Sequence, residues 1–353
     1  MGKDILTSRT QKVAAGTIAS FLQYGLFILL QIILTPLILR IGGQEVLGAF
    51  SIIMQVIGYG ILLDLGFTVA VTRFLSQEYT NDSITKNFVN ILSIGRMFLF
   101  FVNTLFSLLI VFIAVNIDLI ITASEIVLYQ SKQSLSMLAA WTFLKTPISL
   151  YSHALISTQN LAMANIILMF GNFLRLSLSI ILIYSGIGLI GLIAAVIISE
   201  LLTFITQWVF FKKKFPNFRF ISKINDTKLF KDIFSFGTKY WGVNLAAIFL
   251  LGSDFIIVGI IYDASVASIY YSTKIPVFLI ITFIYKISDN SSPAINELFS
   301  LGQYESLRSA YYKIIRYSLI MALPVAIGVV AFNEAIITVW LGAEQFAGNI
   351  MNI

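Results

Sequence analysis

Residues 161–211 read LAMANIILMFGNFLRLSLSIILIYSGIGLIGLIAAVIISELLTFITQWVFF, and this stretch decides the fold. It holds two apolar runs, Leu161–Tyr184 and Leu189–Phe211, on either side of a short Ser-Gly-Ile-Gly break. A helix needs about 20 apolar residues to cross the hydrocarbon core of a bilayer, and both runs are long enough. Each run carries a single charged side chain, Arg175 in the first and Glu200 in the second. The stretch therefore predicts two consecutive transmembrane helices, each with one charge inside it.

The composition extends this pattern to the whole chain. Of its 353 residues, 58% are hydrophobic and only 11% are charged, whereas about 25% of residues are charged in a soluble domain. A disulfide framework is excluded because the chain has no Cys, and the single His cannot build a multi-histidine metal site. Open sheets cannot sit in lipid, and barrel strands would alternate over about ten residues. The composition predicts an all-α integral membrane protein.

Apolar runs of spanning length recur and predict nine transmembrane helices. Their predicted ranges are Val13–Leu39, Val46–Thr72, Phe88–Val115, Ser134–Ile156, Leu161–Tyr184, Leu189–Phe211, Ile233–Tyr262, Val266–Ile287 and Tyr311–Leu341. We expect a six-helix lobe over residues 1–211, a basic linker over 212–231 and an incomplete lobe of three helices over 232–353. Several prolines fall inside the runs and are expected to bend them, because proline removes a backbone hydrogen bond. They are Pro36, Pro147, Pro276 and Pro324.

The basic residues predict the orientation in the membrane. Lys and Arg gather at the N-terminus, between helices two and three, in the 212–231 linker and before helix nine, whereas the opposite loops hold only Arg40 and Lys132. Cytoplasmic loops of membrane proteins carry the excess of Lys and Arg, so the N-terminus is predicted to be cytoplasmic. The basic loops would face the anionic headgroups of membrane lipids. The formal net charge of +6 thus has a plain origin, and no nucleic-acid partner is expected.

Ionisable residues inside the spans are the candidates for function. A charge at the bilayer centre costs at least about 2.5 kcal/mol, so such residues usually face a partner or a wet cavity. The set comprises Asp64, Arg96, Lys145, Arg175, Glu200, Lys239, Asp254 and Lys274. Lys145, Arg175 and Lys274 are expected near the midplane. They would line a cavity that attracts an anion such as phosphate or pyrophosphate, with Arg96 nearer the cytoplasm.

Internal pairing is the alternative for several of these residues. Arg175 with Glu200, and Asp64 with Arg96, would form buried structural bridges. Glu200 and Asp254 are also candidates for proton uptake in coupled transport. Amide side chains inside the spans would bind sugar hydroxyls or join helices by hydrogen bonds. These amides are Gln23, Gln31, Gln55, Asn90, Asn103, Asn165, Asn172 and Asn244.

No arrangement of catalytic residues is recognisable in the sequence. It contains no Gly-rich phosphate loop with a Lys, no paired carboxylates in a loop and no Ser-His-Asp set. We therefore expect no enzyme activity, no catalytic residue, no metal and no cofactor. Any energy for transport would come from an ion gradient or the membrane potential.

Several segments resemble the bacterial Wzx-type polysaccharide flippases. The stretch TPLILRIGGQEVLGAFS at Thr35–Ser51 resembles their first hairpin, and Leu63–Phe67 (LDLGF) with Thr72–Phe74 (TRF) strengthens the likeness. The segments Glu297–Phe299, Tyr304–Arg308, Val339–Gly342 and Phe346–Gly348 resemble the family's surroundings of helix nine. These flippases are O-antigen and exopolysaccharide exporters. They belong to the MOP superfamily, together with the MATE drug antiporters and the lipid II flippases.

The resemblance implies a MATE-like, two-lobed helical bundle of twelve or more helices, with a central cavity and alternating access. It also implies a bacterial cytoplasmic membrane protein that moves undecaprenyl-pyrophosphate-linked oligosaccharides for O-antigen, capsule or exopolysaccharide synthesis. Other polysaccharide assembly proteins are its implied partners. Nine predicted helices fall short of twelve, so the chain is expected to be truncated at its C-terminus, as a fragment, a truncated gene product or a divergent short form. The alternatives are a MATE-class drug or cation antiporter, which wants a net acidic cavity, and a membrane polysaccharide polymerase, which commonly carries a sizeable external loop.

Overall fold

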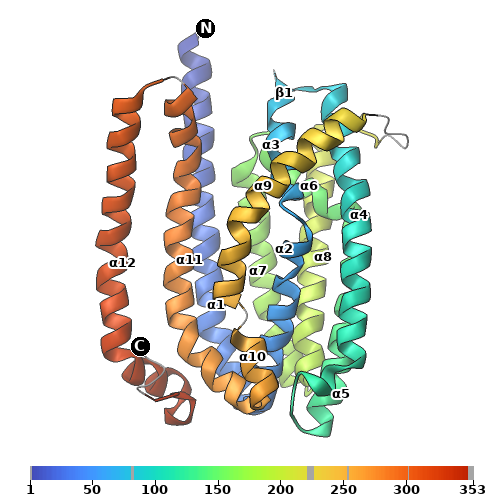
Figure 1. Ribbon diagram of the computed structural model, residues 1–353, viewed down its shortest axis with the longest axis vertical. Helices are drawn as coiled ribbons and strands as arrows, with labels where there is room; N and C mark the ends of the chain where they lie inside the picture. The colour runs from blue at the N-terminus through green and yellow to red at the C-terminus, as the bar shows by residue number, and fades with distance from the viewer. Residues whose placement is uncertain (1, 81–82, 221–225, 253, 301, 349–353) are drawn as a thin grey trace. The chain divides into compact units, whose positions relative to one another are not determined.

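The computed structural model describes residues 2–80, 83–220, 226–252, 254–300 and 302–348 (Figure 1). The regular secondary structure of the described chain is helical except for one antiparallel pair of short strands, β1 (Tyr79–Thr80) and β2 (Ser83–Ile84). It divides into two compact units, Met1–Ala267 and Ser268–Ile353. The predicted lobes and linker stay a prediction, and residues 221–225 of that linker lie outside the described residues.

The described part of the first unit holds ten α-helices and the start of an eleventh. They are α1 (Gly2–Gly58), α2 (Gly60–Leu63), α3 (Phe67–Gln77), α4 (Lys86–Val115), α5 (Glu125–Leu144), α6 (Thr146–Ser157), α7 (Leu161–Tyr184), α8 (Gly188–Lys214), α9 (Thr227–Gly252), α10 (Asp254–Ile261) and the beginning of α11 (Ala264–Ser300), with a short 3-10 turn η1 (Ile117–Leu119) after α4. The second unit holds the rest of α11, α12 (Tyr304–Leu341) and η2 (Ala343–Gln345). The predicted bounds of helix five are confirmed residue for residue by α7, and helix six extends by only a few residues as α8.

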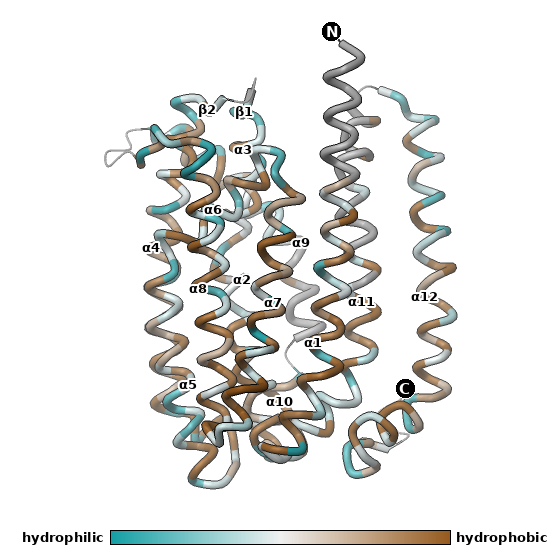
Figure 2. Tube along the Cα trace, turned by 180° about the vertical axis from the view of Figure 1, so that it is seen from behind, coloured by the Kyte–Doolittle hydropathy of each residue, from teal (hydrophilic) through white to brown (hydrophobic). Residues whose placement is uncertain are grey.

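The surface of the helices shows that they face lipid. Large apolar side chains on α4 point outward, and Met97, Phe101 and Phe112 are 69%, 62% and 66% exposed. Figure 2 shows apolar residues in brown along the middle of α4, α7 and α8, and hydrophilic residues in teal near β1 and β2. Soluble proteins do not leave continuous apolar faces of this size in water. The chain is therefore an all-α, multi-pass membrane protein.

Six segments of the described chain are long and apolar enough to span a membrane. They are Ala15–Gly58, Lys86–Val115, Leu161–Tyr184, Gly188–Lys214, Ala264–Thr282 and Tyr304–Leu341. The predicted count of nine crossings is not confirmed by these segments, because several predicted helices are joined or broken.

The joins and breaks have local causes in the sequence. Predicted helices one and two meet inside α1 at Gly43, where φ is 83° and ψ is 177°. Glycine suits this position because it lacks the Cβ that disfavours positive φ. Predicted helix four is divided at Lys145 into α5 and α6, just before Pro147 in the first turn of α6.

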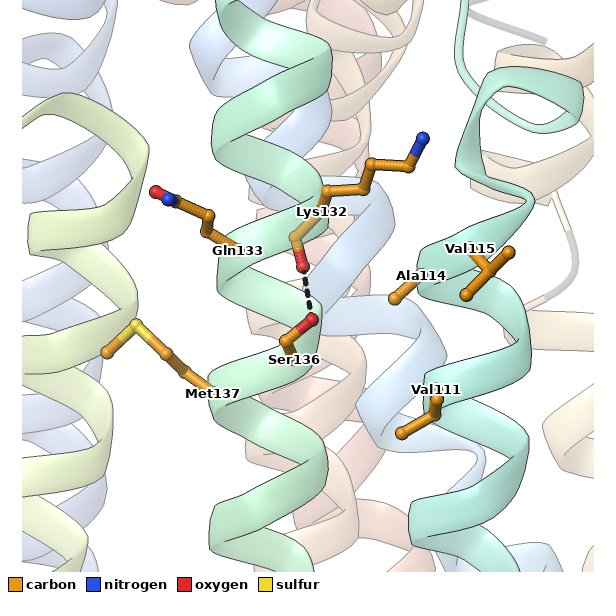
Figure 3. A pocket seen from close by; sticks show the side chains of 7 residues that line it. All are labelled: Val111, Ala114, Val115, Lys132, Gln133, Ser136 and Met137. Carbon is orange, nitrogen blue, oxygen red and sulfur yellow. Dashed lines mark hydrogen bonds between the residues drawn. The ribbon is translucent and has the colours of Figure 1, made fainter.

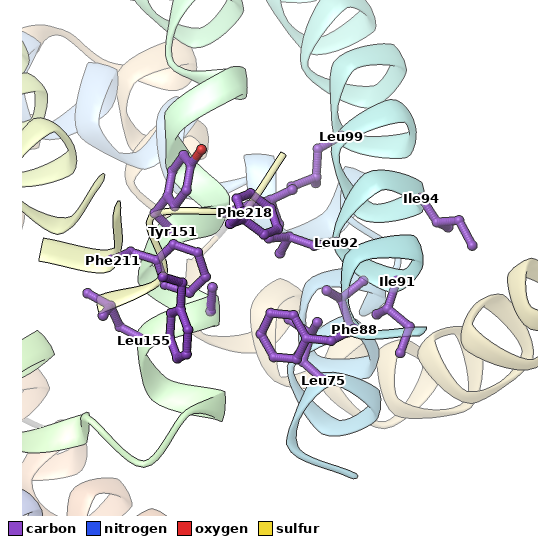
Figure 4. Packing of buried hydrophobic residues seen from close by; sticks show 14 of the residues in the cluster. Leu75, Phe88, Ile91, Leu92, Ile94, Leu99, Tyr151, Leu155, Phe211 and Phe218 are labelled. Carbon is purple, nitrogen blue, oxygen red and sulfur yellow. The ribbon is translucent and has the colours of Figure 1, made fainter. Parts of the chain in front are cut away.

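An aromatic core holds one end of the first unit together (Figure 4). The rings of Phe67 on α3 and Phe98 on α4 stack with their centroids 3.9 Å apart. Phe211, near the end of α8, is fully buried, and its ring lies 5.4 Å from that of Tyr151 and 5.3 Å from that of Phe218. Because Phe218 lies beyond α8, this packing fixes the segment that follows α8 against α6.

A backbone-to-backbone contact joins α1 to the start of α11 within the first unit. A Cβ added to Gly48 would lie 1.7 Å from the backbone oxygen of Ala264. The backbone N–H of Ala264 donates to the carbonyl of Thr122, 3.0 Å away, which holds this part of α11 in place. Only glycine allows the two helices to approach so closely here.

We predict that Gly48→Ala lowers the thermal stability of the detergent-purified protein. The added methyl overpacks a backbone contact, at a cost of about 1–3 kcal/mol or more. Gly25→Ala is the matched control, because a Cβ at that position of the same helix meets nothing within 4 Å. It should leave the melting temperature unchanged or raise it, since alanine costs less conformational entropy than glycine. Equal losses in the two variants would contradict the contact.

Candidate functional site

One cavity inside the first unit collects three of the predicted site residues. It has a volume of about 280 Å³ and lies among α1, α5, α7 and α8. Its ionisable lining consists of Lys145, Arg175 and Glu200. Two cations and one carboxylate give the lining a formal charge of +1. Ligand pockets commonly measure about 300–1,000 Å³, so this cavity suits a small polar group rather than a whole oligosaccharide.

Lys145 reaches the cavity because it lies at the break between α5 and α6. Its backbone N–H donates to the carbonyl of Trp141, 2.9 Å away, and so ends α5. Its own carbonyl accepts from the backbone N–H groups of Ile148 and Ser149, at 3.1 and 3.0 Å, and so starts α6. Pro147 has no N–H to continue the first helix through this point. Both backbone polar groups of Lys145 are thus hydrogen-bonded within the protein, as lipid requires of a break in a predicted spanning helix.

Glu200 on α8 contacts two different partners with its two carboxylate oxygens. The Nζ of Lys145 lies 3.4 Å from Oε1, and the indole N–H of Trp141 donates to Oε2. Trp141 is buried, whereas the side chains of Lys145 and Glu200 are 23% and 33% exposed. The ion pair is therefore open to the cavity on one side and anchored to α5 on the other.

Arg175 and Asn172 supply the α7 side of the cavity. They are three residues apart, which places them on neighbouring turns of one helix face. The Nδ2 of Asn172 is buried and has no hydrogen-bond partner among the described residues. Most buried polar groups are hydrogen-bonded, so an amide donor of this kind lining a cationic cavity is suited to receive an anionic ligand.

The other predicted site residues lie elsewhere in the first unit. Both carboxylate oxygens of Asp64 lie 3.2 Å from the backbone nitrogen of Thr68, which donates to them at the start of α3. The guanidinium of Arg96 lies over the ring of Phe220, 4.0 Å from its centroid. In the part of the chain that the structure describes, no ion pair joins Asp64 to Arg96. The pairing considered for them from the sequence is therefore not found.

Asp254 and Lys274 do not line this cavity. Asp254 is the first residue of α10, and its Oδ1 accepts a hydrogen bond from the backbone N–H of Phe255 at 3.1 Å. Lys274 belongs to the second unit, where its Nζ lies 5.8 Å from the ring centroid of Tyr270. Within that unit, Ser268 and Ser272 donate to Oε1 of the buried Gln345.

Two larger hollows on the first unit do not bring charges together. One, of about 640 Å³, lies between α4 and α5 (Figure 3). Its one charged residue, Lys132, pairs with the exposed Asp118 at 3.5 Å. The other, of about 560 Å³, follows the turn at Gly43 and contains Glu45, which accepts hydrogen bonds from the backbone N–H and the hydroxyl of Ser124. The smaller cavity with its three ionisable side chains is therefore the candidate site.

Sequence reasoning missed Trp141 as a functional residue and gave Asn172 no specific place. Helical spacing contains the signal for both. Trp141 precedes Lys145 by four residues and Asn172 precedes Arg175 by three, so each shares a helix face with a cation that was predicted near the midplane. The partner of Glu200 also differs from the one considered, because Lys145 rather than Arg175 forms the ion pair within 4 Å among the described residues.

Comparison with known proteins identifies the family. Residues 40–347 match the family model described as "Polysaccharide biosynthesis protein". The chain belongs to this polysaccharide biosynthesis protein family. A search of the curated proteins finds no match.

Solved structures of MOP superfamily transporters share the fold of this polysaccharide biosynthesis protein. A MATE transporter in the bent conformation is 16% identical, with a TM-score of 0.64 over 96% of this chain and 76% of that one. A MOP superfamily transporter from Pyrococcus furiosus is 16% identical, with a TM-score of 0.66 over 97% and 77%. An outward-facing multidrug resistance MATE family transporter is 16% identical, with a TM-score of 0.64 over 96% and 78%. The predicted MATE-like helical fold is thus confirmed.

We predict a measurable coupling between Lys145 and Glu200 in a double-mutant cycle. Lys145→Gln and Glu200→Gln should each lower the unfolding free energy by about 1–3 kcal/mol, because each leaves one charge unpaired in a half-buried site. The double variant should lose less than the sum of the two, as measured by thermal unfolding in one detergent.

Lys132 and Asp118 provide the matched control pair. Their ion pair has nearly the same length, 3.5 Å, but the two side chains are 44% and 58% exposed. The coupling there should stay below about 1 kcal/mol because solvent screens it. Similar couplings in the two pairs would show that the Lys145–Glu200 contact gains nothing from its cavity.

Proposed function

We propose that this protein translocates undecaprenyl-pyrophosphate-linked oligosaccharide repeat units across the bacterial cytoplasmic membrane. The exported units would serve the synthesis of O-antigen, capsule or exopolysaccharide. The N-terminus would face the cytoplasm, and the protein would act by alternating access rather than as an enzyme. The observation that carries this proposal is a cavity with two cations and one carboxylate inside a member of the polysaccharide biosynthesis protein family.

The charge of the cavity suits the head of such a substrate. A pyrophosphate carries several negative charges, and guanidinium and ammonium groups bind phosphate oxygens through charge-assisted hydrogen bonds. These contacts are strong where water is partly excluded, because the effective dielectric constant is low. Arg175 would supply a planar fork of donors and Lys145 a point charge. The cavity of about 280 Å³ would hold the head only, so that the glycan and the lipid chain lie outside it.

The fold supports transport, and the charge supports an anionic cargo. A cationic drug would meet Arg175 and Lys145, and the single carboxylate of Glu200 is already paired with Lys145. For the Pyrococcus furiosus transporter, reverse polarity of the binding pocket suggests a different function. We apply the same argument here: within one fold, the charge of the pocket indicates the cargo, and a net positive cavity favours a lipid-linked oligosaccharide over a cationic drug. Membrane lipids and other polysaccharide assembly proteins would be the partners.

The assay uses a flippase-null strain in which the wild-type gene restores surface polysaccharide. We predict that the Arg175→Gln gene restores much less surface polysaccharide in this strain. Export should fall about tenfold or more, because the cavity loses its bidentate cation, whereas Arg175→Lys should retain part of it. Surface polysaccharide is measured by immunoblotting at matched protein levels. Lys132→Gln is the control, because Lys132 lies in the exposed hollow between α4 and α5.

The same strains separate this proposal from drug export. Wild-type protein that raises drug resistance without restoring polysaccharide, in strains supplying a range of lipid-linked repeat units, would overturn the proposal. Full export by Arg175→Gln would instead show that the cavity is not used by the substrate.

A further inference from the structure

The ion pair between Lys145 and Glu200 is built so that one partner can leave without releasing the other. Lys145 contacts only Oε1 of Glu200, at 3.4 Å, which is long for a charge-assisted hydrogen bond. Oε2 of Glu200 is held separately by the indole N–H of Trp141. If Lys145 turned to another anion, Glu200 would keep its bond to a buried tryptophan. The carboxylate would then stay in place without its cation.

The charges of the cavity define what can displace Glu200. With the ion pair between Lys145 and Glu200 intact, the lining keeps a formal net charge of +1. A ligand with one negative charge matches this net charge without breaking the pair. A ligand with two or more charges requires a second cation as well, and Lys145 is the other one that the described residues place in the lining. The buried amide donor of Asn172 lines the same cavity and adds a hydrogen bond for such a ligand.

We propose that Glu200 is an internal competitor for Lys145, which a diphosphate displaces and a monoanion does not. This inference rests on the proposed function, since it assigns the affinity for the pyrophosphate head to the exchange. In the empty cavity Lys145 is paired with Glu200. In the loaded cavity Lys145 and Arg175 both bind the ligand, and Trp141 retains Glu200. When the ligand leaves, Lys145 pairs with Glu200 again. This ion pair offsets part of the free energy of binding and so favours release of the ligand.

The exchange predicts that Glu200→Gln binds diphosphate more tightly than the wild-type protein. The glutamine keeps an oxygen for the Trp141 N–H but no longer competes for the Lys145 ammonium. The affinity of the full chain in lipid nanodiscs for inorganic pyrophosphate should rise about three- to tenfold, a modest pairwise coupling. The affinity for dimethyl phosphate, which carries one negative charge at neutral pH, should rise at least as much, because Lys145 becomes available to it. Titration calorimetry measures both.

Asp118→Asn is the matched control for this experiment. It also removes a carboxylate 3.5 Å from a lysine, but outside the cavity, and both affinities should stay at the wild-type value. Unchanged or weaker pyrophosphate binding by folded Glu200→Gln would overturn the inference. Should Glu200→Gln fail to fold by size-exclusion chromatography, Glu200→Asp tests the same point. Aspartate keeps the negative charge, but its shorter side chain moves the carboxylate away from Lys145. If Glu200→Asp binds pyrophosphate no more tightly than the wild-type protein, the exchange is again overturned.

Translocation assays separate this inference from the proposed function. Proteoliposomes with wild-type protein are supplied with a fluorescent polyprenyl-pyrophosphate-linked oligosaccharide, and no translocation by the wild type would count against the proposed function itself. If the wild type is active, Glu200→Gln should bind pyrophosphate more tightly and translocate more slowly, because release is retarded. Loss of the response to an imposed proton gradient, with unchanged pyrophosphate affinity, would identify Glu200 as a proton carrier and overturn the exchange.

Discussion

The structure depends on one constraint, which is that lipid offers no hydrogen bonds to the backbone and no solvation to charges. Each interruption of a spanning helix must therefore be satisfied by the protein. Two of the predicted ionisable residues lie at interruptions of predicted spanning helices: Asp64 between α2 and α3, and Lys145 between α5 and α6. Asp64 accepts from a backbone N–H of α3. An acidic group at a helix start also interacts favourably with the helix dipole. Charges and helix breaks thus occur together and support one another.

The apolar pattern predicted the helices well, because side chains that face lipid must be apolar along the whole length of a spanning segment. The ends of α7 agree with the sequence because Leu161 follows a polar break and Tyr184 precedes a Ser-Gly pair. Breaks inside the runs were harder to predict, since hydropathy does not change at them. Pro147 indicated a bend in predicted helix four, yet only the structure shows that the chain divides there and that Lys145 lies at the division.

Part of the candidate site could also be predicted, because depth along a helix follows from residue counting. Lys145 and Arg175 were expected near the midplane, and they do line one cavity, together with Glu200 but without Lys274. Direction around the helix axis does not follow from depth, because it depends on which helices are neighbours. For this reason the partner of Glu200, the role of Trp141 and the separation of Asp64 from Arg96 emerged only from the structure. The placement of Arg96 over Phe220 has a similar cause, since Phe220 lies in a segment whose path is set by packing against Phe218 and Tyr151.

Different residues of this sequence determine the fold and the charge of the cavity. The fold rests on long apolar faces, which many residue combinations satisfy, and this explains how chains only 16% identical share it. The sign of the cavity rests on three side chains. With Glu200 alone it would attract cations, as a drug antiporter requires, and the addition of Lys145 and Arg175 reverses that preference. Similarity of fold therefore identifies the helical architecture. Under the proposed function, the choice between a cationic drug and an anionic lipid-linked sugar would depend on whether Lys145 and Arg175 are both present beside Glu200.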